Sequence, residues 1–197
     1  MNGLVCLVGP PGVGKSTVSR CLADRYGVEV FRVREFAGRV RVLDPASRGV
    51  LAVPNPLGWY GDVAVRYCLR RAFLRGWVAA SGLVVLEDLP VSVEQMGQVS
   101  AVACVRQVPL VVVELTAPDR VLRQRAATTG VGTPAVFVAR SARFRRRIGG
   151  IRHAAVVRAR PYHRVDASGG VDECVARVWA ACGLLLAAGS HTGGAGW

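Results

Sequence analysis

The segment GPPGVGKST, residues 9–17, constrains the fold of this chain more than any other part of it. It follows the apolar run GLVCLV (3–8), which predicts a buried strand, and it opens residues 14–26, which predict a helix. Glycines at this spacing let the backbone turn tightly, so that several N–H groups point at one spot beside the positive end of the helix. Such a loop is typical of a site that holds a polyphosphate. We expect the whole loop to line that site: Gly9, Pro10, Pro11, Gly12, Val13, Gly14, Lys15, Ser16 and Thr17.

Two polar features of this region have specific predicted roles. In the pattern Gly-x-x-x-x-Gly-Lys-Ser, Lys15 is expected to reach the β- and γ-phosphates of ATP, and the Ser16 hydroxyl to ligate Mg²⁺. The segment LVVLEDLP (83–90) adds an acidic strand end, where a carboxylate can hold the metal or its water. Side-chain alternation lets only one of Glu87 and Asp88 face the metal easily, and the pattern leaves both open. The alternative is an acidic strand end that caps the next helix.

Composition limits the class of protein. With 197 residues, 51% of them hydrophobic, the chain suffices for one well-filled domain and is short for two. No apolar run approaches about 18 residues and no secretory signal is visible, so we expect no membrane span and a cytoplasmic protein. The six cysteines lack zinc-ligand spacing, which predicts reduced thiols and no structural zinc.

The formal net charge of +13 allows two interpretations. Lys15 is the only lysine among 26 basic residues, so the remaining basic residues are all arginine. Such a surface could bind a polyanion, or it could simply keep the protein soluble. We do not expect a nucleic-acid partner. The expected partners are a nucleotide and a small-molecule acceptor, bound by a monomer.

Apolar strands and amphipathic helices alternate along the rest of the chain. Further strands are predicted at 28–33, 82–87, 109–115 and 162–168. Further helices are predicted at 35–42, 59–76, 91–105, 117–128, 140–160 and 171–188, with loops at 44–58 and 127–139. This alternation predicts an α/β fold, a three-layer sandwich around a five-stranded parallel sheet. We expect one domain over 1–188 and a flexible tail over 189–197.

In this order, the motifs resemble the adenylate kinase family of nucleoside monophosphate kinases. GPPGVGKST resembles its phosphate loop, LEDLPVSVEQ its third-strand segment and LGWYGDVAV its acceptor-site segment. VVVELTAPDRVLRQR resembles the strand and helix that lead to its lid, and RVDASGGVDECVARV its closing strand and helix. The resemblance implies a P-loop NTPase sandwich with an acceptor-binding insertion at about 33–76 and a short lid at about 126–139.

The resemblance also implies roles in phosphoryl transfer for residues outside the loop. With Lys15, the catalytic residues would be Glu87 on the metal side, Arg125 at the lid hinge and Arg143 on the helix after the lid, with Arg140 as the alternative to Arg143. The metal ligands would come from Ser16, Glu87 and Asp88.

On the acceptor side, the resemblance gives Gln95 the place that reads an adenine edge and Asp62 the place of a helix-opening acid. Trp59 and Tyr60 could stack on an acceptor ring or pack in the core. The expected acceptor residues are Glu35, Arg39, Trp59, Asp62 and Gln95.

Several arginines of that family are absent. The positions of the arginines that clamp the acceptor phosphate are occupied here by Gly38 and Val91, although Arg34 and Arg39 are close to Gly38 in the sequence. The position of a further lid arginine lies near Thr129. Phosphoryl transfer depends mostly on positioning and charge neutralisation. Their loss therefore indicates a weaker enzyme, a rearranged one, or an acceptor without that phosphate.

Three functions follow as hypotheses. The first is an ATP-dependent kinase that phosphorylates an AMP-like nucleoside monophosphate. The second is a small-molecule kinase that phosphorylates a hydroxyl of a nucleoside, metabolite or antibiotic, with Glu35, Asp62 or Asp88 as general base. The third is a nucleotide-binding switch without catalysis, which the lost arginines and the positive charge would fit.

Overall fold

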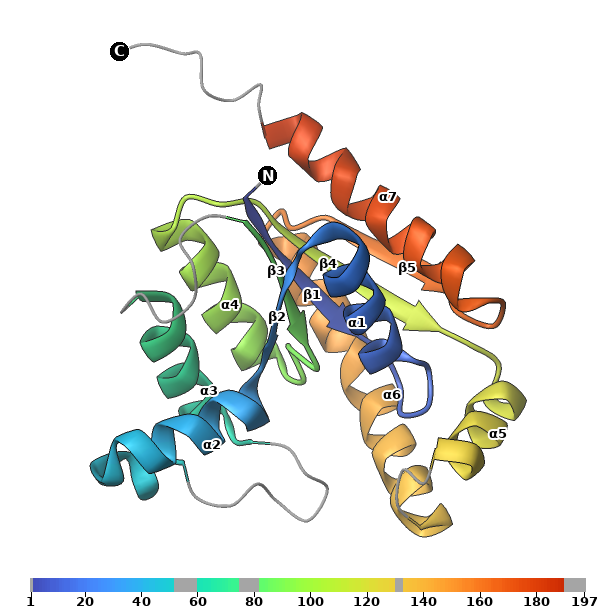
Figure 1. Ribbon diagram of the computed structural model, residues 1–197, viewed down its shortest axis with the longest axis horizontal. Coiled ribbons are helices and arrows are strands. Elements are labelled where there is room, and N and C mark those ends of the chain that lie inside the picture. Colours follow the sequence, from blue (N-terminus) through green and yellow to red (C-terminus); the bar gives the residue numbers. More distant parts are fainter. Residues whose placement is uncertain (1, 52–59, 75–81, 130–132, 190–197) are drawn as a thin grey trace.

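The computed structural model describes residues 2–51, 60–74, 82–129 and 133–189, and the strands in these ranges form one parallel sheet. The strands are β1 (Gly3–Val8), β2 (Glu29–Arg32), β3 (Leu83–Glu87), β4 (Leu110–Thr116) and β5 (Tyr162–Asp166). They lie in the order β2–β3–β1–β4–β5 (Figure 1). The predicted α/β fold with a five-stranded parallel sheet is therefore confirmed.

Seven α-helices occur in the described part of the chain. They are α1 (Lys15–Tyr26), α2 (Val33–Leu43), α3 (Asp62–Leu69), α4 (Val93–Val105), α5 (Asp119–Thr129), α6 (Pro134–Val157) and α7 (Val171–Gly189). A short 3₁₀ turn, Pro45–Arg48, follows α2, and a π turn, Arg70–Leu74, continues α3. None of the described helices is long and apolar enough to cross a membrane.

Helices on both faces of the sheet make the three layers (Figure 1). The central strands β1, β3 and β4 are nearly continuous apolar runs because they are covered from both sides, whereas the edge strands β2 and β5 carry charged and partly exposed residues. On one face, Val5 and Leu7 of β1 pack against α1 and α7. On the other, Leu4 and Cys6 of β1 join the cluster formed with α2, α3, α4 and α6. Alternation along a single strand thus fills both cores.

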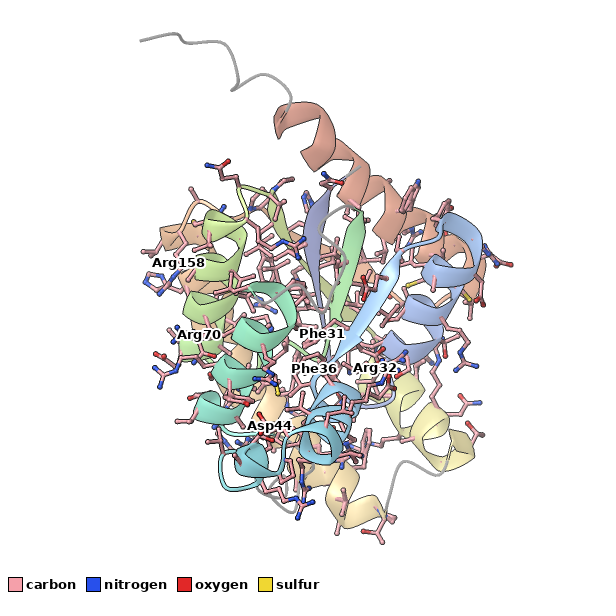
Figure 2. All side chains as sticks on the ribbon, turned by 60° about the vertical axis from the view of Figure 1, so that its left-hand side comes forward. Phe31, Arg32, Phe36, Asp44, Arg70 and Arg158 are labelled. Atoms are coloured by element: carbon pink, nitrogen blue, oxygen red, sulfur yellow. The ribbon has the colours of Figure 1, made fainter. Side chains whose placement is uncertain are left out.

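The edge strand β2 is joined to α2 by aromatic packing. Phe31 and Phe36 belong to the second cluster, and their ring centroids are 5.3 Å apart (Figure 2). Arg32 lies between these two rings in the sequence, where the strand ends and the helix begins. This packing fixes the place from which the Arg32 side chain leaves the sheet.

The carboxyl ends of the central strands meet at one edge of the sheet. Leu7 of β1 lies beside Glu87 of β3, and Val8 lies beside Glu114 of β4. The chain leaves β1 into the glycine loop at this edge. Strand β3 lies on one side of β1 and strand β4 on the other. In parallel sheets, ligands bind at such a point, where the strand order reverses.

The segment 127–139 differs from its prediction as a loop. Helix α5 runs to Thr129 and α6 begins at Pro134, so the predicted lid at about 126–139 consists largely of two helix ends. The Thr133 side chain accepts a hydrogen bond from the Val136 N–H, and Pro134 takes the first turn. A threonine followed by proline is a favourable helix start, a signal that the polar composition of the segment obscured.

The other boundaries shift by a few residues. Part of the predicted loop at 44–58 forms the 3₁₀ turn, and α7 ends at Gly189, the first residue of the predicted tail. Residues 190–197 of that tail and Trp59 lie outside the described residues.

Candidate functional site

The glycine loop after β1 has a backbone that only glycine accommodates at some positions. Gly12 and Gly14 have φ angles of 78° and 99°, in the left-handed region. A Cβ atom on Gly9 would lie 2.9 Å from the Leu115 carbonyl oxygen, and one on Gly12 would lie 2.8 Å from that of Leu122. No side chain caps the N-terminus of α1, so its first N–H groups are left for an anionic ligand.

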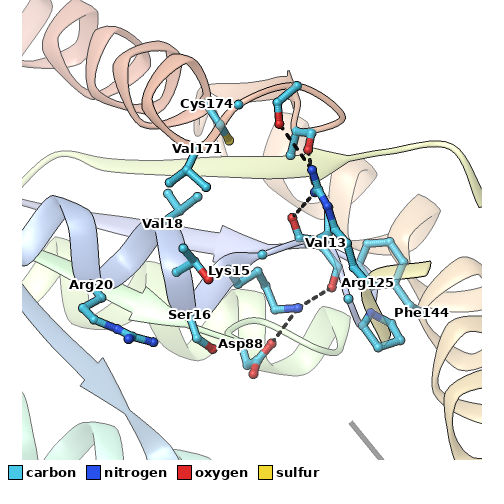
Figure 3. A pocket seen from close by; sticks show the side chains of 18 of the residues that line it. Val13, Lys15, Ser16, Val18, Arg20, Asp88, Arg125, Phe144, Val171 and Cys174 are labelled. Carbon is cyan, nitrogen blue, oxygen red and sulfur yellow. Dashed lines mark hydrogen bonds and ion pairs between the residues drawn. The ribbon is translucent and has the colours of Figure 1, made fainter. Parts of the chain in front are cut away.

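Lys15 folds back over this loop (Figure 3). Its Nζ donates to the carbonyl oxygens of Gly9 and Pro10 at 2.9 and 3.1 Å, and lies 3.3 Å from Asp88 Oδ1. The ammonium group is thus held at the centre of the loop by groups that a phosphate could replace. A compact, flexible point charge suits this position.

The acidic pair at the end of β3 is divided between two partners. Glu87 is buried, and its Oε1 accepts a 2.5 Å hydrogen bond from the Ser16 hydroxyl. Asp88 is exposed, has a positive φ of 61°, and faces Lys15. A non-glycine residue in this region of backbone space is uncommon and often marks a functional site.

Ser16, Glu87 and Asp88 supply only oxygen ligands, which suit Mg²⁺. This ion is usually bound by one or two carboxylates together with substrate phosphates, and it needs no larger protein cage. No group of three or more His, Cys, Asp or Glu residues that could hold a metal occurs in the described ranges. The oxygen atoms of Ser16, Glu87 and Asp88 therefore fit a magnesium ion that would arrive with the nucleotide.

Arg32 holds the second oxygen of Glu87. Its Nε donates to Glu87 Oε2 at 2.8 Å, and its Nη1 donates to Glu35 Oε1 at 3.2 Å. Burial acts to lower the pKa of Arg32, but the hydrogen bond to Glu87 and the two carboxylates outweigh it and raise that pKa. Sequence reasoning gave Arg32 no role, because a charge at the end of an edge strand carries no motif.

A cavity of about 480 Å³ lies over the glycine loop. Eight of the nine predicted loop residues line it; Pro10 instead supplies a carbonyl oxygen to Lys15. Arg125 and Phe144 also line the cavity. We refer to this space as the donor cavity, because the loop that lines it has the pattern of a polyphosphate site.

Arg125 braces the donor cavity through backbone contacts. Its Nη1 donates to the Ala167 carbonyl at 2.7 Å, and its Nη2 to the carbonyls of Ser168 and Gly169 at 3.3 Å. A further contact of 3.5 Å joins it to the Val13 carbonyl of the glycine loop. Arg125 therefore lies at the donor cavity, and its guanidinium ties α5 to the loop before α7.

A second cavity, of about 530 Å³, opens on the other side of Ser16. Its wall includes Arg34 and Glu35 at the start of α2, Tyr60, and Gln95 of α4. We call it the acceptor cavity. Four residues line both cavities: Ser16, Arg20, Asp88 and Arg140.

Two of these shared residues are arginines with room for a ligand. Arg20 follows Ser16 by four residues on α1, so both side chains leave the same face of the helix (Figure 3). Among the described residues, no hydrogen bond or ion pair joins the side chain of Arg20 or Arg140 to another residue, and the Arg140 Nε is buried. The spacing from Ser16 is a signal in the sequence that could have identified Arg20.

The structure separates Arg140 from Arg143, which the sequence left as alternatives. Arg140 lines both cavities, whereas Arg143 is absent from the described walls of either. Burial, together with the neighbouring Arg147 and Arg146, lowers the pKa of Arg143. Arg39, another predicted acceptor residue, is exposed on α2 and also absent from both described walls.

The side chains of Gln95 and Asp62, both predicted acceptor residues, are hydrogen-bonded to each other. Gln95 Oε1 accepts from the Val91 N–H at 3.0 Å, and its Nε2 donates to Asp62 Oδ1 at 2.9 Å. The same Asp62 oxygen accepts from the Ser92 hydroxyl, which caps α4. Gln95 still forms part of the acceptor wall, whereas Asp62 does not appear in the described wall of either cavity.

Comparison with known proteins identifies the family. Residues 4–146 match the model of the AAA domain family, and the chain therefore belongs to that family. The crystal structure of a gluconokinase from Sinorhizobium meliloti 1021 is similar, with a TM-score of 0.60 and 18% identity over 96% of this chain and 97% of that one. At this identity the likeness concerns the fold, which is that of a P-loop kinase. No curated protein matches the chain.

Proposed function

We propose that this chain is an ATP-dependent kinase that transfers the γ-phosphoryl group to a hydroxyl group of a small molecule. The observation that carries the proposal is the wall shared by the donor and acceptor cavities, formed by Ser16, Arg20, Asp88 and Arg140. A terminal phosphate held by the glycine loop would lie at this wall. An acceptor in the neighbouring cavity could reach that phosphate directly.

The donor side fits Mg-ATP. The glycine loop, the uncapped end of α1 and Lys15 would bind the phosphates, with the ammonium exchanging its loop carbonyls and Asp88 for phosphate oxygens. Magnesium, when bound beside Ser16 and Glu87, supplies charge neutralisation on the β- and γ-phosphates. Arg20 and Arg140 add positive charge where the two cavities meet, beside the place where the transferred phosphoryl group would lie.

Asp88 is the best candidate for the general base. Its carboxylate is exposed at the shared wall, where it could accept the proton of an acceptor hydroxyl as that oxygen attacks the γ-phosphorus and ADP leaves. Glu35 lines the acceptor cavity but is paired with Arg32. Asp62 is held by Ser92 and Gln95. Of the three carboxylates considered from the sequence, Asp88 therefore has the most suitable place.

A second candidate, a nucleoside monophosphate kinase, is favoured by Gln95. Its amide lies in the acceptor wall, where it could read a base edge. The internal hydrogen bonds of this amide and the missing phosphate-clamp arginines weigh against that function. A kinase-like fold shared with a gluconokinase is compatible with both candidates and agrees better with a small polar acceptor.

The proposal is tested by ADP release from Mg-ATP with a panel of acceptors. The panel should include unphosphorylated sugars, sugar acids such as gluconate, nucleosides, and the common nucleoside monophosphates. We expect release with an unphosphorylated acceptor, its loss in Lys15→Ala, and a fall of about 10²–10⁴-fold in Asp88→Asn. Release only with a monophosphate would favour the second candidate. ATP binding with no turnover across a broad panel would favour a nucleotide-binding switch.

A further inference from the structure

Arg32 connects the two cavities without lining both. Its guanidinium is in the wall of the acceptor cavity and is absent from the described wall of the donor cavity. Its Nε bonds to Glu87 Oε2, and the other oxygen of Glu87 accepts from the Ser16 hydroxyl. A continuous chain of hydrogen bonds therefore runs from the acceptor wall to the end of the glycine loop.

The burial of Glu87 makes this chain energetically significant. The Glu87 side chain is 4% exposed, whereas that of Arg32 is 31% exposed. A buried carboxylate is costly unless charged or polar groups satisfy both oxygens. Arg32 and Ser16 each take one oxygen, so together they fix the direction in which the carboxylate faces.

The position of Arg32 is itself well determined. It is the last residue of β2, directly before α2, and Arg32 Nη1 also bonds to Glu35 in the first turn of that helix. Phe31 precedes this junction in the sequence and Phe36 follows it, and their two rings pack against each other (Figure 2). Two carboxylates thus hold the guanidinium, and the aromatic contact holds the backbone junction from which it extends.

We propose that Arg32 is a positioning residue for the metal side of the donor site. It holds the buried Glu87 carboxylate so that Oε1 faces Ser16, the residue placed to ligate magnesium. This inference rests on the proposed function, since it assumes that Mg-ATP binds at the glycine loop. The inference adds that Arg32, in the wall of the acceptor cavity, affects magnesium binding beside Ser16 and Glu87.

A direct role for Arg32 in acceptor binding makes a different prediction. An arginine that only contacts the acceptor would leave nucleotide and magnesium binding unchanged when it is removed. An arginine that acts through Glu87 would weaken magnesium-dependent nucleotide binding even when no acceptor is present. Loss of an outer partner of a metal ligand commonly lowers metal affinity by about 10–100-fold.

The test is the binding of a non-hydrolysable ATP analogue by calorimetry, with Mg²⁺ and with EDTA, in the full chain without any acceptor. The Kd measured with EDTA, divided by the Kd measured with Mg²⁺, gives the factor by which magnesium tightens nucleotide binding. We expect Arg32→Ala to lower this ratio by about tenfold or more, and Arg32→Lys to lower it less. Arg34→Ala, which removes an arginine from the same acceptor wall, should leave the ratio unchanged.

A double-mutant comparison shows whether Arg32 acts through Glu87. In the Glu87→Gln background, Arg32→Ala should change the ratio no further, because the carboxylate that it positions is gone. If Arg32→Ala alone fails to fold, Glu87→Gln can still be compared with the double variant, because the double variant has no buried carboxylate at position 87 left without a partner. An additional loss in the double variant would overturn the inference.

The results separate this inference from the proposed function. If the wild type binds the analogue more tightly with Mg²⁺ and Arg32→Ala keeps the full ratio, the positioning role is wrong and the donor site stands. If the wild type binds the analogue equally with and without Mg²⁺, both the metal side of the site and the positioning role are wrong.

Discussion

The buried carboxylate of Glu114 fastens α6 to the sheet, and breaking this contact should destabilise the protein measurably. Arg152 of α6 donates to both Glu114 oxygens, from Nε at 3.0 Å and from Nη2 at 2.8 Å. The Tyr162 hydroxyl donates to Oε2 at 2.8 Å, and Arg164 lies 3.6 Å from the same oxygen. The helix held by this contact carries Arg140 to the shared wall of the two cavities.

The cost of Arg152→Ala follows from what remains behind. The Glu114 side chain is 2% exposed, so the variant would leave a buried carboxylate whose remaining partners among the described residues are Tyr162 and Arg164. Removing one partner of a buried pair costs about 3–5 kcal/mol. Because the Arg152 side chain is 39% exposed and partly screened, we expect the lower end, about 3 kcal/mol. In a chain of this length that corresponds to a fall in Tm of about 6–12 °C.

Thermal unfolding followed by circular dichroism measures this effect. Arg145→Ala is a matched control on the same helix, because Arg145 pairs with Asp119 at 3.3 Å and both side chains are well exposed. Its loss should cost less than about 1 kcal/mol. Glu114→Gln should also be milder than Arg152→Ala, since the arginine left behind can reach water. Equal shifts in Tm for Arg152→Ala and Arg145→Ala would mean that the buried Glu114 carboxylate does not depend on Arg152.

Three further predictions concern the site and the core. Arg140→Ala should lower kcat by about 10²–10³-fold, whereas Arg143→Ala should retain kcat within a few-fold; the reverse order would show that Arg143 serves the transfer. Gln95→Leu should lower Tm, because it leaves the Val91 N–H and Asp62 without their partner; an unchanged Tm would mean that water replaces the amide. Burial raises the pKa of the Cys182 thiol from 9.0 to about 12. Between about pH 9 and 12 the folded state therefore keeps a proton that the unfolded chain loses, so the free energy of unfolding should fall across this range. Urea midpoints across this range should fall less steeply in Cys182→Ala, and equal slopes would contradict the assignment.

The sequence predicted the fold well because the signals that set it are local. Continuous apolar runs mark strands covered on both faces, and the glycine loop places a helix directly after β1. The same loop could be recognised from the sequence as one wall of the donor cavity, because its glycines are required by backbone angles that no other residue adopts easily. The boundary at Pro134 was missed because polar composition concealed a helix start.

The acceptor side was harder to predict because its residues come together only in the folded chain. Arg32 reaches Glu87 from 55 positions away, across β2 and β3. Asp62 seemed available for catalysis in the sequence, but Ser92 and Gln95 occupy it from another helix. No local pattern predicts such contacts, since they depend on which side chains the sheet order brings together.

The most direct test of the proposed function follows the phosphoryl group itself. ATP labelled in its γ-phosphoryl group would be incubated with the wild-type chain, Mg²⁺ and a mixture of unphosphorylated hydroxyl compounds and AMP, and the labelled products identified by mass spectrometry. We expect label on a hydroxyl of an unphosphorylated compound, and none above background with Lys15→Ala. Label found only on AMP, or only as free phosphate, would contradict the proposed function.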